Sequence, residues 1–480
     1  MATLACLCVA PVCRRLATGR RRQASWRLAL SFGLGRRAVN ADRGTDRQSR
    51  RGWIIVGTTF MTLAVLYGAW YSYSVFLVAL LREFGWSRSL VAGAFSLFVL
   101  VHGVCGPIIG WFLRVAGPRR VILVGACVMV VGLILTAEAT KWWHLYVGFG
   151  GISAVGMGLA GWVPAVILIR GWFPGNVGTM VGIASAGIGI GIFALVPMAQ
   201  FLIDWVGWRW AYRVLAALIV GWVLPATLWL IRDPPAGEAA FASPASRAAP
   251  TAPQARSYWT LATAVKGWRF WGLAANYFTG NFVTQMIMIH QVAYLVDHGV
   301  PALTAAAVGG ASGLVSIVGK IGWGWFSDRT NRELAYSLAF GCLVASMGLL
   351  VLAGLYRTPF LLYLYAVLIG LGYGVMAPVP PAVASDLYGG PGFSTIFGGL
   401  YIATCLGLAT GTWSAGKIFD STGSYAVALW VGLAMAVLAP ALLWVVAPRR
   451  PNPPPGRKPS VICDQLSASR WGPRMHQADC

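Results

Sequence analysis

One lysine lies inside an apolar run, where a positive charge is costly. Asp328 marks the end of that run, and Lys320 stands eight residues before it. At a helical rise of about 1.5 Å per residue, Lys320 lies about 12 Å inside the run. In a membrane, an ammonium at such a depth costs on the order of 2.5 kcal/mol or more. The side chain must face a wet cavity or a counter-ion, and pairing with an anion fits its chemistry. Snorkelling to the interface and a structural ion pair are the alternatives.

Neutral polar side chains in other apolar runs are candidates for the same site. Tyr67 and Tyr71 lie one helical turn apart and can donate hydroxyl protons to a carboxylate, although aromatic residues at this spacing also simply pack. His102 is either a group that titrates during a working cycle or a hydrogen-bonded packing residue. Gln285 and His290 belong to a polar run, and we expect one of them to line a solute path, because polar side chains in membrane helices face protein or water.

These side chains require long apolar helices to position them. Of the 480 residues, 58% are hydrophobic and only 11% are charged, whereas a soluble domain is about 25% charged. A helix that crosses a membrane needs about 20 mostly apolar residues. Twelve such runs occur, near 53–80, 89–113, 119–138, 143–169, 177–203, 210–231, 268–294, 303–326, 334–355, 359–383, 393–418 and 424–447. The sequence predicts an all-α polytopic membrane protein with twelve transmembrane helices in two six-helix halves.

A loop rich in Pro, Ala and Ser separates six runs from six. The expected domains are a basic disordered tail at 1–51, a first half at 52–231, a linker at 232–267, a second half at 268–447 and a disordered tail at 448–480. A targeting peptide is the alternative for the first tail. The tripeptide Gly-Trp-Phe at 110–112 recurs 214 residues later, and the spacing of Thr179, Gly182 and Gly191 recurs 216 residues later. These offsets predict parallel duplication of a six-helix unit. The three prolines within 378–381 predict a broken helix.

Lys and Arg are distributed unevenly between the two sides of the predicted bundle. Of 37 such residues, 29 fall on the side of both tails, seven on the other side, and one within a helix. Positive loops mark the cytoplasmic side. We therefore expect both termini in the cytoplasm, and a bacterial inner membrane as the location. The net charge of +23 does not indicate nucleic acid binding, because the charge lies outside the helices and largely in the tails.

Two loops resemble the helix 2–3 signature of the major facilitator superfamily, in which a glycine precedes Asp-Arg and then glycine and basic residues. The first copy, within 110–120, has Arg114 where that family has its aspartate, followed by Arg119 and Arg120. The second copy keeps the pair as Asp328 and Arg329. The resemblance implies a gate that stabilises one conformation through contacts between an acid and a helix. An ordinary basic loop is the alternative.

Residues 51–447 also resemble the monocarboxylate porter family, including its oxalate/formate antiporter-like relatives. The likeness is carried by Arg170-Gly-Trp-Phe before a Gly-rich helix, and by Ser-Asp-Leu-Tyr at 385–388 before the next helix. It implies a gating role for Arg170. Lys320 falls where this family carries a substrate-binding arginine, whereas Ser316 and Tyr71 replace the aspartate and lysine of its proton-coupling scheme. These replacements argue against proton symport by that route and leave exchange or another coupling open.

Together these features predict a secondary transporter that moves a small carboxylate by alternating access, with Lys320 as the partner of the anion. An exporter of drug-like or other small organic solutes is the main alternative, and a transporter-like sensor without flux is a lesser one. An enzyme is not expected, because the 14 acidic residues form no cluster for acid–base chemistry. No cofactor, metal or obligatory protein partner is expected. The expected partners are the substrate anion, the lipid bilayer and a coupling ion or counter-substrate.

Overall fold

Helices are the regular elements throughout the part of the chain that the computed structural model describes, residues 51–173, 177–233, 259–389 and 393–447. The all-α prediction is therefore confirmed for these ranges. Apart from Arg51, the predicted tails lie outside the described residues, as does most of the predicted linker.

The first half begins with a helical span, Arg51–Phe84, whose last part is α2 (Tyr73–Phe84). It continues through α3 (Arg88–Val104), α4 (Gly106–Ala137), α5 (Trp142–Leu145), the π-helical segment η1 (Tyr146–Ser153), α6 (Ala154–Ala160), α7 (Trp162–Trp172), α8 (Val177–Val206), α9 (Trp208–Leu218) and the π-helical segments η2 (Ile219–Val223) and η3 (Ala226–Leu230). Left-handed Gly85 (φ 63°) ends α2, and the Ser87 side chain then caps α3 by accepting from the backbone nitrogen of Leu90.

The second half repeats this organisation. It contains α10 (Leu261–Ala264), α11 (Trp268–Asp297), α12 (Ala302–Arg329), α13 (Arg332–Tyr356), α14 (Pro359–Gly374), α15 (Val379–Tyr388), α16 (Phe393–Thr422) and α17 (Ala426–Val446). The predicted break at the prolines is confirmed, because α14 ends at Gly374 and α15 begins at Val379. Prolines fit the first turn of α15, where a backbone N–H has no helical partner.

Ten helical spans among the described residues are long and apolar enough to cross a membrane. Two further helices complete the predicted twelve. The uninterrupted helix α3 is short, because the chain breaks at Cys105 and a proline begins α4. Helix α11 is long enough to cross a membrane at 30 residues, but it is less apolar than the ten spans, because it carries buried polar side chains such as Asn276, Gln285 and His290.

One boundary differs from the expectation. Residues 89–113 were expected as one helix, but the chain breaks at Cys105, so α3 ends at Val104 and the first part of α4 takes up the rest of that run. The chain turns sharply inside α4 at Gly117, whose φ of 78° and ψ of 156° are open only to glycine at little cost. The expected division between 89–113 and 119–138 is therefore present, as the turn at Gly117.

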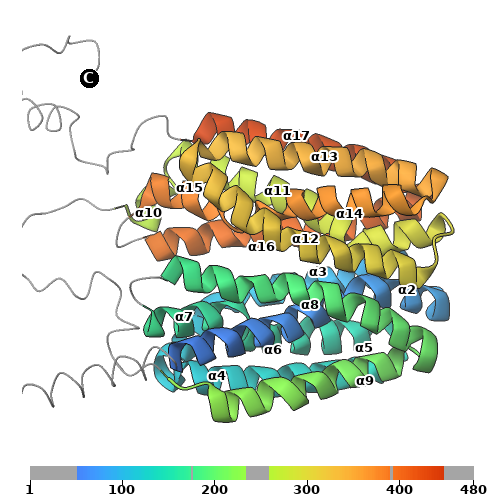
Figure 1. Ribbon diagram of the computed structural model, residues 1–480, viewed down its shortest axis with the longest axis horizontal. Coiled ribbons are helices and arrows are strands. Elements are labelled where there is room, and N and C mark those ends of the chain that lie inside the picture. Colours follow the sequence, from blue (N-terminus) through green and yellow to red (C-terminus); the bar gives the residue numbers. More distant parts are fainter. Residues whose placement is uncertain (1–50, 174–176, 234–258, 390–392, 448–480) are drawn as a thin grey trace, which may run out of the picture. The chain divides into compact units, whose positions relative to one another are not determined.

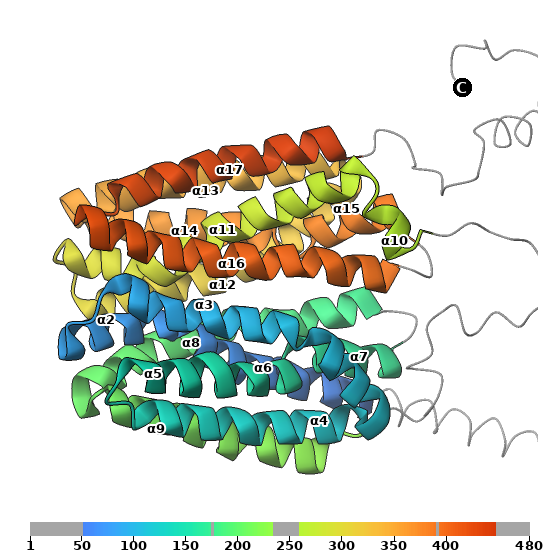
Figure 2. The ribbon, with the colours of Figure 1, turned by 180° about the vertical axis from the view of Figure 1, so that it is seen from behind.

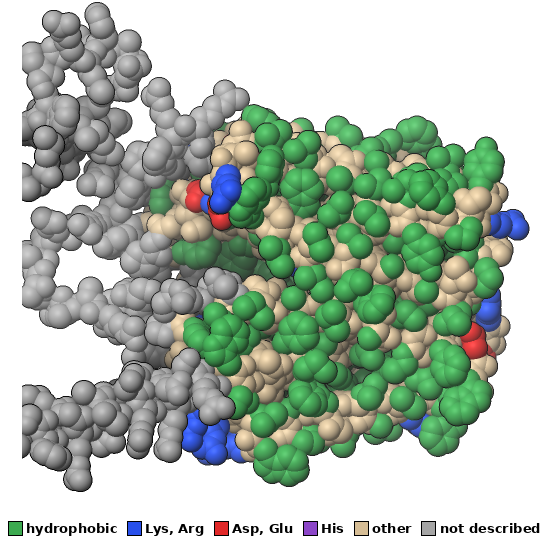
Figure 3. Space-filling view, in the orientation of Figure 1, with side chains coloured by type: hydrophobic (Ala, Val, Ile, Leu, Met, Phe, Trp, Pro, Cys, Tyr) green, Lys and Arg blue, Asp and Glu red, His purple; other side chains and the backbone are tan. Residues whose placement is uncertain are grey.

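The helices of the two halves lie on opposite sides of a shared seam (Figures 1 and 2). The seam consists mainly of two helix pairs, α3 with α16 and α8 with α12. Apolar side chains cover the flank of the bundle in Figure 3, while Lys, Arg, Asp and Glu gather at its two ends. This pattern suits a flank that faces lipid. We call the end at which α3 begins the Arg88 end, and the opposite end, at which α12 finishes, the Asp328 end.

Glycines bring helices into backbone contact in both halves. A Cβ atom at Gly191 in α8 would lie 2.0 Å from the carbonyl oxygen of Ala64, and one at Gly407 in α16 would lie 2.3 Å from that of Phe278. Small residues at such positions let two helices approach closely. The glycines are 216 residues apart and their partners 214, which matches the offsets of the sequence repeat.

Candidate functional site

Lys320 is half-buried on α12, beside the end of α14. Its Nζ lies 5.5 Å from the centre of the Tyr373 ring. A Cβ atom at Gly374 would lie 2.9 Å from the backbone nitrogen of Lys320, so the two helices touch at this point. Among the described residues, no carboxylate lies within ion-pair distance of Lys320. An aromatic ring is a weak partner for a full charge, so the ammonium keeps capacity for an anion.

Tyr373 connects Lys320 to the first half. Its hydroxyl is 2.7 Å from the hydroxyl of Tyr71 across the seam. Tyr67 lies within electrostatic reach of Tyr373 and of the Cys405 thiol. The structure thus brings three residues predicted from sequence, Lys320, Tyr67 and Tyr71, to one place between the halves. Sequence reasoning missed Tyr373; the only signal was its place in the glycine-rich stretch before the proline break.

His102 lies behind this group, within the first half. Its ring packs edge-on against Trp70 with the ring centres 5.4 Å apart, and Trp70 in turn stacks on Tyr67 at 5.5 Å. The residue is 5% exposed, and its Nδ1 has no hydrogen-bond partner among the described residues. A buried nitrogen without a partner costs free energy. A role for His102 in substrate handling stays a prediction.

Two predicted polar residues of α11 have different surroundings. His290 is held by both ring nitrogens, with Nδ1 3.0 Å from the Tyr425 hydroxyl and Nε2 2.9 Å from the Thr412 carbonyl oxygen. Because the carbonyl can only accept, Nε2 carries the proton and Nδ1 accepts from Tyr425. Gln285 is 1% exposed, and its Nε2 has no partner among the described residues. Of the two, Gln285 therefore keeps unused hydrogen-bonding capacity.

The loop within α4 is fastened to the end of the first half. The Arg119 side chain donates to the carbonyl oxygens of Thr227 at 3.1 Å and Leu228 at 2.5 Å, while its backbone nitrogen donates to Asp233 at 3.2 Å. Asp233 thus places a carboxylate at the start of the helix that follows Gly117, where negative charge is favourable.

The other basic residues predicted for this gate are less engaged. Arg120 and Arg170 are exposed, and neither makes an ion pair within the described part of the chain. The side chain of Arg114 lies outside what the structure describes. Asp233 was not predicted, since it follows the last helix of the half and lies 114 residues from Arg119.

The corresponding loop of the second half is organised around Arg332. This side chain lies 2.5 Å from Asp328 and 3.1 Å from Asp386 on α15. The arginine of the motif, Arg329, instead lies over the Trp325 ring, 4.2 Å from its centre. Asp328 therefore fastens α12 to α13 and, through Arg332, to α15, within one half.

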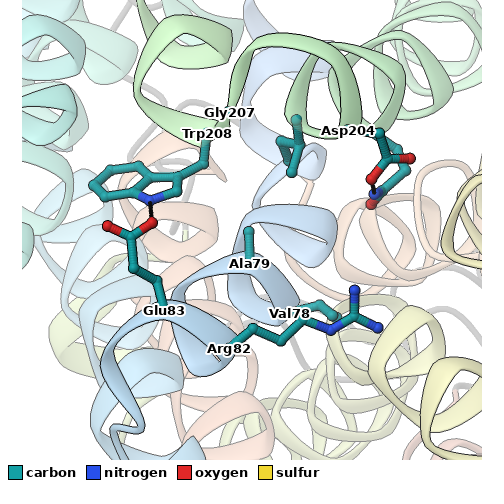
Figure 4. A pocket seen from close by; sticks show the side chains of 9 residues that line it. Val78, Ala79, Arg82, Glu83, Asp204, Gly207 and Trp208 are labelled. Carbon is teal, nitrogen blue, oxygen red and sulfur yellow. Dashed lines mark hydrogen bonds between the residues drawn. The ribbon is translucent and has the colours of Figure 1, made fainter.

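A recess of about 390 Å³ opens at the Arg88 end between α2, α8 and α9 (Figure 4). Its acidic side chains already have partners. Glu83 accepts from Trp208 Nε1 and pairs with Arg209 at 2.5 Å, and Asp204 accepts from Gln200 Nε2 at 2.9 Å. None of the site residues predicted from sequence lines this recess.

Comparisons with known proteins agree with this architecture. A family model described as Major Facilitator Superfamily matches residues 59–389. The chain is similar to monocarboxylate transporter 12 of Rattus norvegicus, at 27% identity over 406 residues, covering 80% of this chain and 83% of that protein. It is also similar to monocarboxylate transporter 13 of Rattus norvegicus, at 26% identity over 378 residues, covering 78% and 84%.

A solved structure has the same fold. It is the crystal structure of a bacterial homolog to the human lysosomal transporter Spinster, in an inward-facing and occupied conformation, with a TM-score of 0.62 and 15% identity over 82% of this chain and 96% of that one. At this identity the likeness concerns the fold alone. The family model, however, spans more than half of the sequence. The chain belongs to the Major Facilitator Superfamily and is an integral membrane transporter rather than an enzyme.

Proposed function

We propose that this transporter moves a small carboxylate by alternating access, and that Lys320 pairs with the negative charge of the substrate. The observation that supports this most directly is the ammonium at the seam, which has no carboxylate within ion-pair distance among the described residues. A poorly solvated cation without a partner is unfavourable, and a bound anion offsets that cost. The similarity to monocarboxylate transporters favours the same class of substrate.

An exporter of drug-like or other small organic solutes is the main alternative. If its solutes were hydrophobic cations, it would gain from a buried acid, whereas the residue at this place is a lysine beside Tyr373, whose hydroxyl bonds that of Tyr71. A sensor that binds without flux is the other alternative, and uptake measurements distinguish it from a transporter. We place both termini in the cytoplasm on the distribution of Lys and Arg, and the protein in a bacterial inner membrane.

Exchange of anions is the coupling that fits the charges at the site. Ser316 is buried and donates to the Gly313 carbonyl oxygen at 2.7 Å, and Tyr71 is neutral, so neither supplies an ionised partner to Lys320. An empty carrier would have to occlude a bare ammonium, which is costly in a low dielectric. A loaded carrier occludes a neutral pair. We therefore infer that the carrier reorients mainly when it is loaded.

The test is uptake of labelled mono- and dicarboxylates into proteoliposomes, either empty or preloaded with the same unlabelled compound. Wild type is compared with Lys320→Ala and with a control, Lys417→Ala, which removes a positive charge from an exposed position. We expect saturable uptake by wild type and by the control, faster into preloaded liposomes, and loss of uptake in Lys320→Ala.

Two results would contradict the proposal. If no carboxylate is taken up by correctly folded wild type, the substrate class is wrong. If Lys320→Ala takes up a carboxylate normally, the anion partner lies elsewhere. Equal uptake into empty and preloaded liposomes would overturn the exchange mode and leave the substrate class intact.

A further inference from the structure

A network of charged and aromatic side chains joins the two halves at the Arg88 end. Arg88, in the first turn of α3, donates from Nη2 to Asp297 at 2.8 Å and from Nη1 to the Tyr425 hydroxyl at 2.8 Å. Its guanidinium also lies 3.8 Å from the centre of the Phe419 ring. One first-half side chain thus contacts the end of α11, the end of α16 and the start of α17. The guanidinium suits this position because it binds a carboxylate, a hydroxyl and an aromatic face at once.

The backbone of the same turn is also bound by the second half. Asp420 accepts from the backbone nitrogens of Arg88 and Ser89, each at 2.8 Å. A Cβ atom at Gly416 would lie 2.9 Å from the Arg88 carbonyl carbon, so α16 and α3 approach closely here. These bonds are made by the α3 backbone and add to the contacts of the Arg88 side chain at this end.

A second layer extends the network into the second half. Burial raises the pKa of the Tyr425 hydroxyl, which keeps its proton and donates it to His290 Nδ1 while accepting from Arg88. His290 in turn donates to the Thr412 carbonyl oxygen. The hydrogen bonds therefore run in one direction from Arg88 to the interior of α16, and such chains strengthen each other in a low dielectric.

The Asp328 end has no comparable fastening in the described part of the chain. The hydrogen bonds of Arg119 and Arg332 there stay within their own halves. The cross-half bonds instead lie at the Arg88 network, at Ser96 with the Ala409 carbonyl oxygen, and at Tyr71 with Tyr373. We propose that Arg88 is a positioning residue that sets the resting conformation: its side chain holds the Arg88 end closed and thereby leaves the Asp328 end open.

Hydrogen–deuterium exchange of the full chain in lipid nanodiscs tests this without any substrate, so the result is independent of the proposed function. In Arg88→Ala we expect exchange to rise roughly tenfold in the first turns of α3 and the last turns of α16, as fits the loss of charge-assisted hydrogen bonds. We expect exchange to fall in the first turns of α16 and the last turns of α12, because those turns become covered when the Asp328 end closes. Asp297→Asn should shift both ends in the same directions by less.

Arg213→Ala is the matched control. This substitution breaks the ion pair between Arg213 and Glu138, whose charged atoms are 2.5 Å apart. The ion pair lies at the same end of the bundle, but both residues belong to the first half. Opposite changes at the two ends in Arg88→Ala, and not in the control, support the proposal. Unchanged exchange, a rise at both ends that signals general destabilisation, or the same opposite changes in Arg213→Ala would each overturn it.

Discussion

The two halves of this transporter share a helical plan but contribute different chemistry. At the seam the first half supplies the hydroxyl groups of Tyr67 and Tyr71, whereas the second half supplies the ammonium of Lys320 beside the hydroxyl of Tyr373. The backbone contacts of Gly191 and Gly407, in contrast, occur in both halves. Contacts between backbones permit almost no change in either copy, because no side chain fits there. A charged side chain needs only one partner within reach, so the residue at such a position can differ between the two halves.

The loops of the two halves show the same freedom. The second-half loop keeps an acid inside its motif, Asp328, paired with Arg332. The first-half loop has Arg114 at the matching position and receives its carboxylate from Asp233, at the end of the half. The carboxylate of the loop therefore comes from different parts of the sequence in the two halves. In each half it lies near the start of the helix that follows the loop.

The largest expected effect tests what the halves share. Gly191→Ala and Gly407→Ala each place a Cβ atom within 2.3 Å of a carbonyl oxygen, and each should lower the free energy of unfolding by about 1–3 kcal/mol. Thermal unfolding of purified protein measures this. The controls are Gly182→Ala and Gly398→Ala, which meet nothing within 4 Å and should be neutral or slightly stabilising. A loss in one half alone would show that the duplication does not extend to this contact.

A smaller effect contrasts the two buried histidines. His290→Phe removes a ring with two hydrogen bonds and should lower the free energy of unfolding by about 1–2 kcal/mol. His102→Phe keeps the aromatic shape against Trp70 and removes a nitrogen without a partner among the described residues, so the change should stay within about 1 kcal/mol. Thermal unfolding of both variants checks the contrast. An equal loss for the two would mean that His102 has a partner in the working protein.

The smallest effect concerns the loops. Asp233→Ala removes a carboxylate from a helix start and should cost about 0.5–1 kcal/mol. Asp328→Ala should cost less, because Asp328 is 68% exposed and Arg332 keeps Asp386 as a partner. Parallel thermal unfolding curves decide the order. A larger loss of stability in Asp328→Ala than in Asp233→Ala would show that the acid within the motif contributes more than the acid at the end of the first half.

Much of the fold follows from local sequence. Apolar runs and helix breakers predict the twelve helices and the break before Val379, because each depends on a few neighbouring residues. The break at Cys105 was missed, since it interrupts an apolar run and leaves no mark on hydropathy.

The site was predictable only where a residue type is unusual in its surroundings. Lys320 is conspicuous because a cation in an apolar run is rare. Tyr373 and Asp233 are ordinary residues in ordinary places, and their importance comes from partners 302 and 114 positions away. Tertiary packing creates such pairs, and a single sequence considered by itself contains no signal for them.

The seam has a consequence for biosynthesis. Because it consists mainly of α3 with α16 and α8 with α12, each half satisfies most of its own contacts before it meets the other. The ribosome delivers the first half to the membrane while α16 and α12 are still unmade. We therefore expect the first half to wait as a packed six-helix intermediate, and two separately translated halves, divided within 234–258, to assemble into a working carrier.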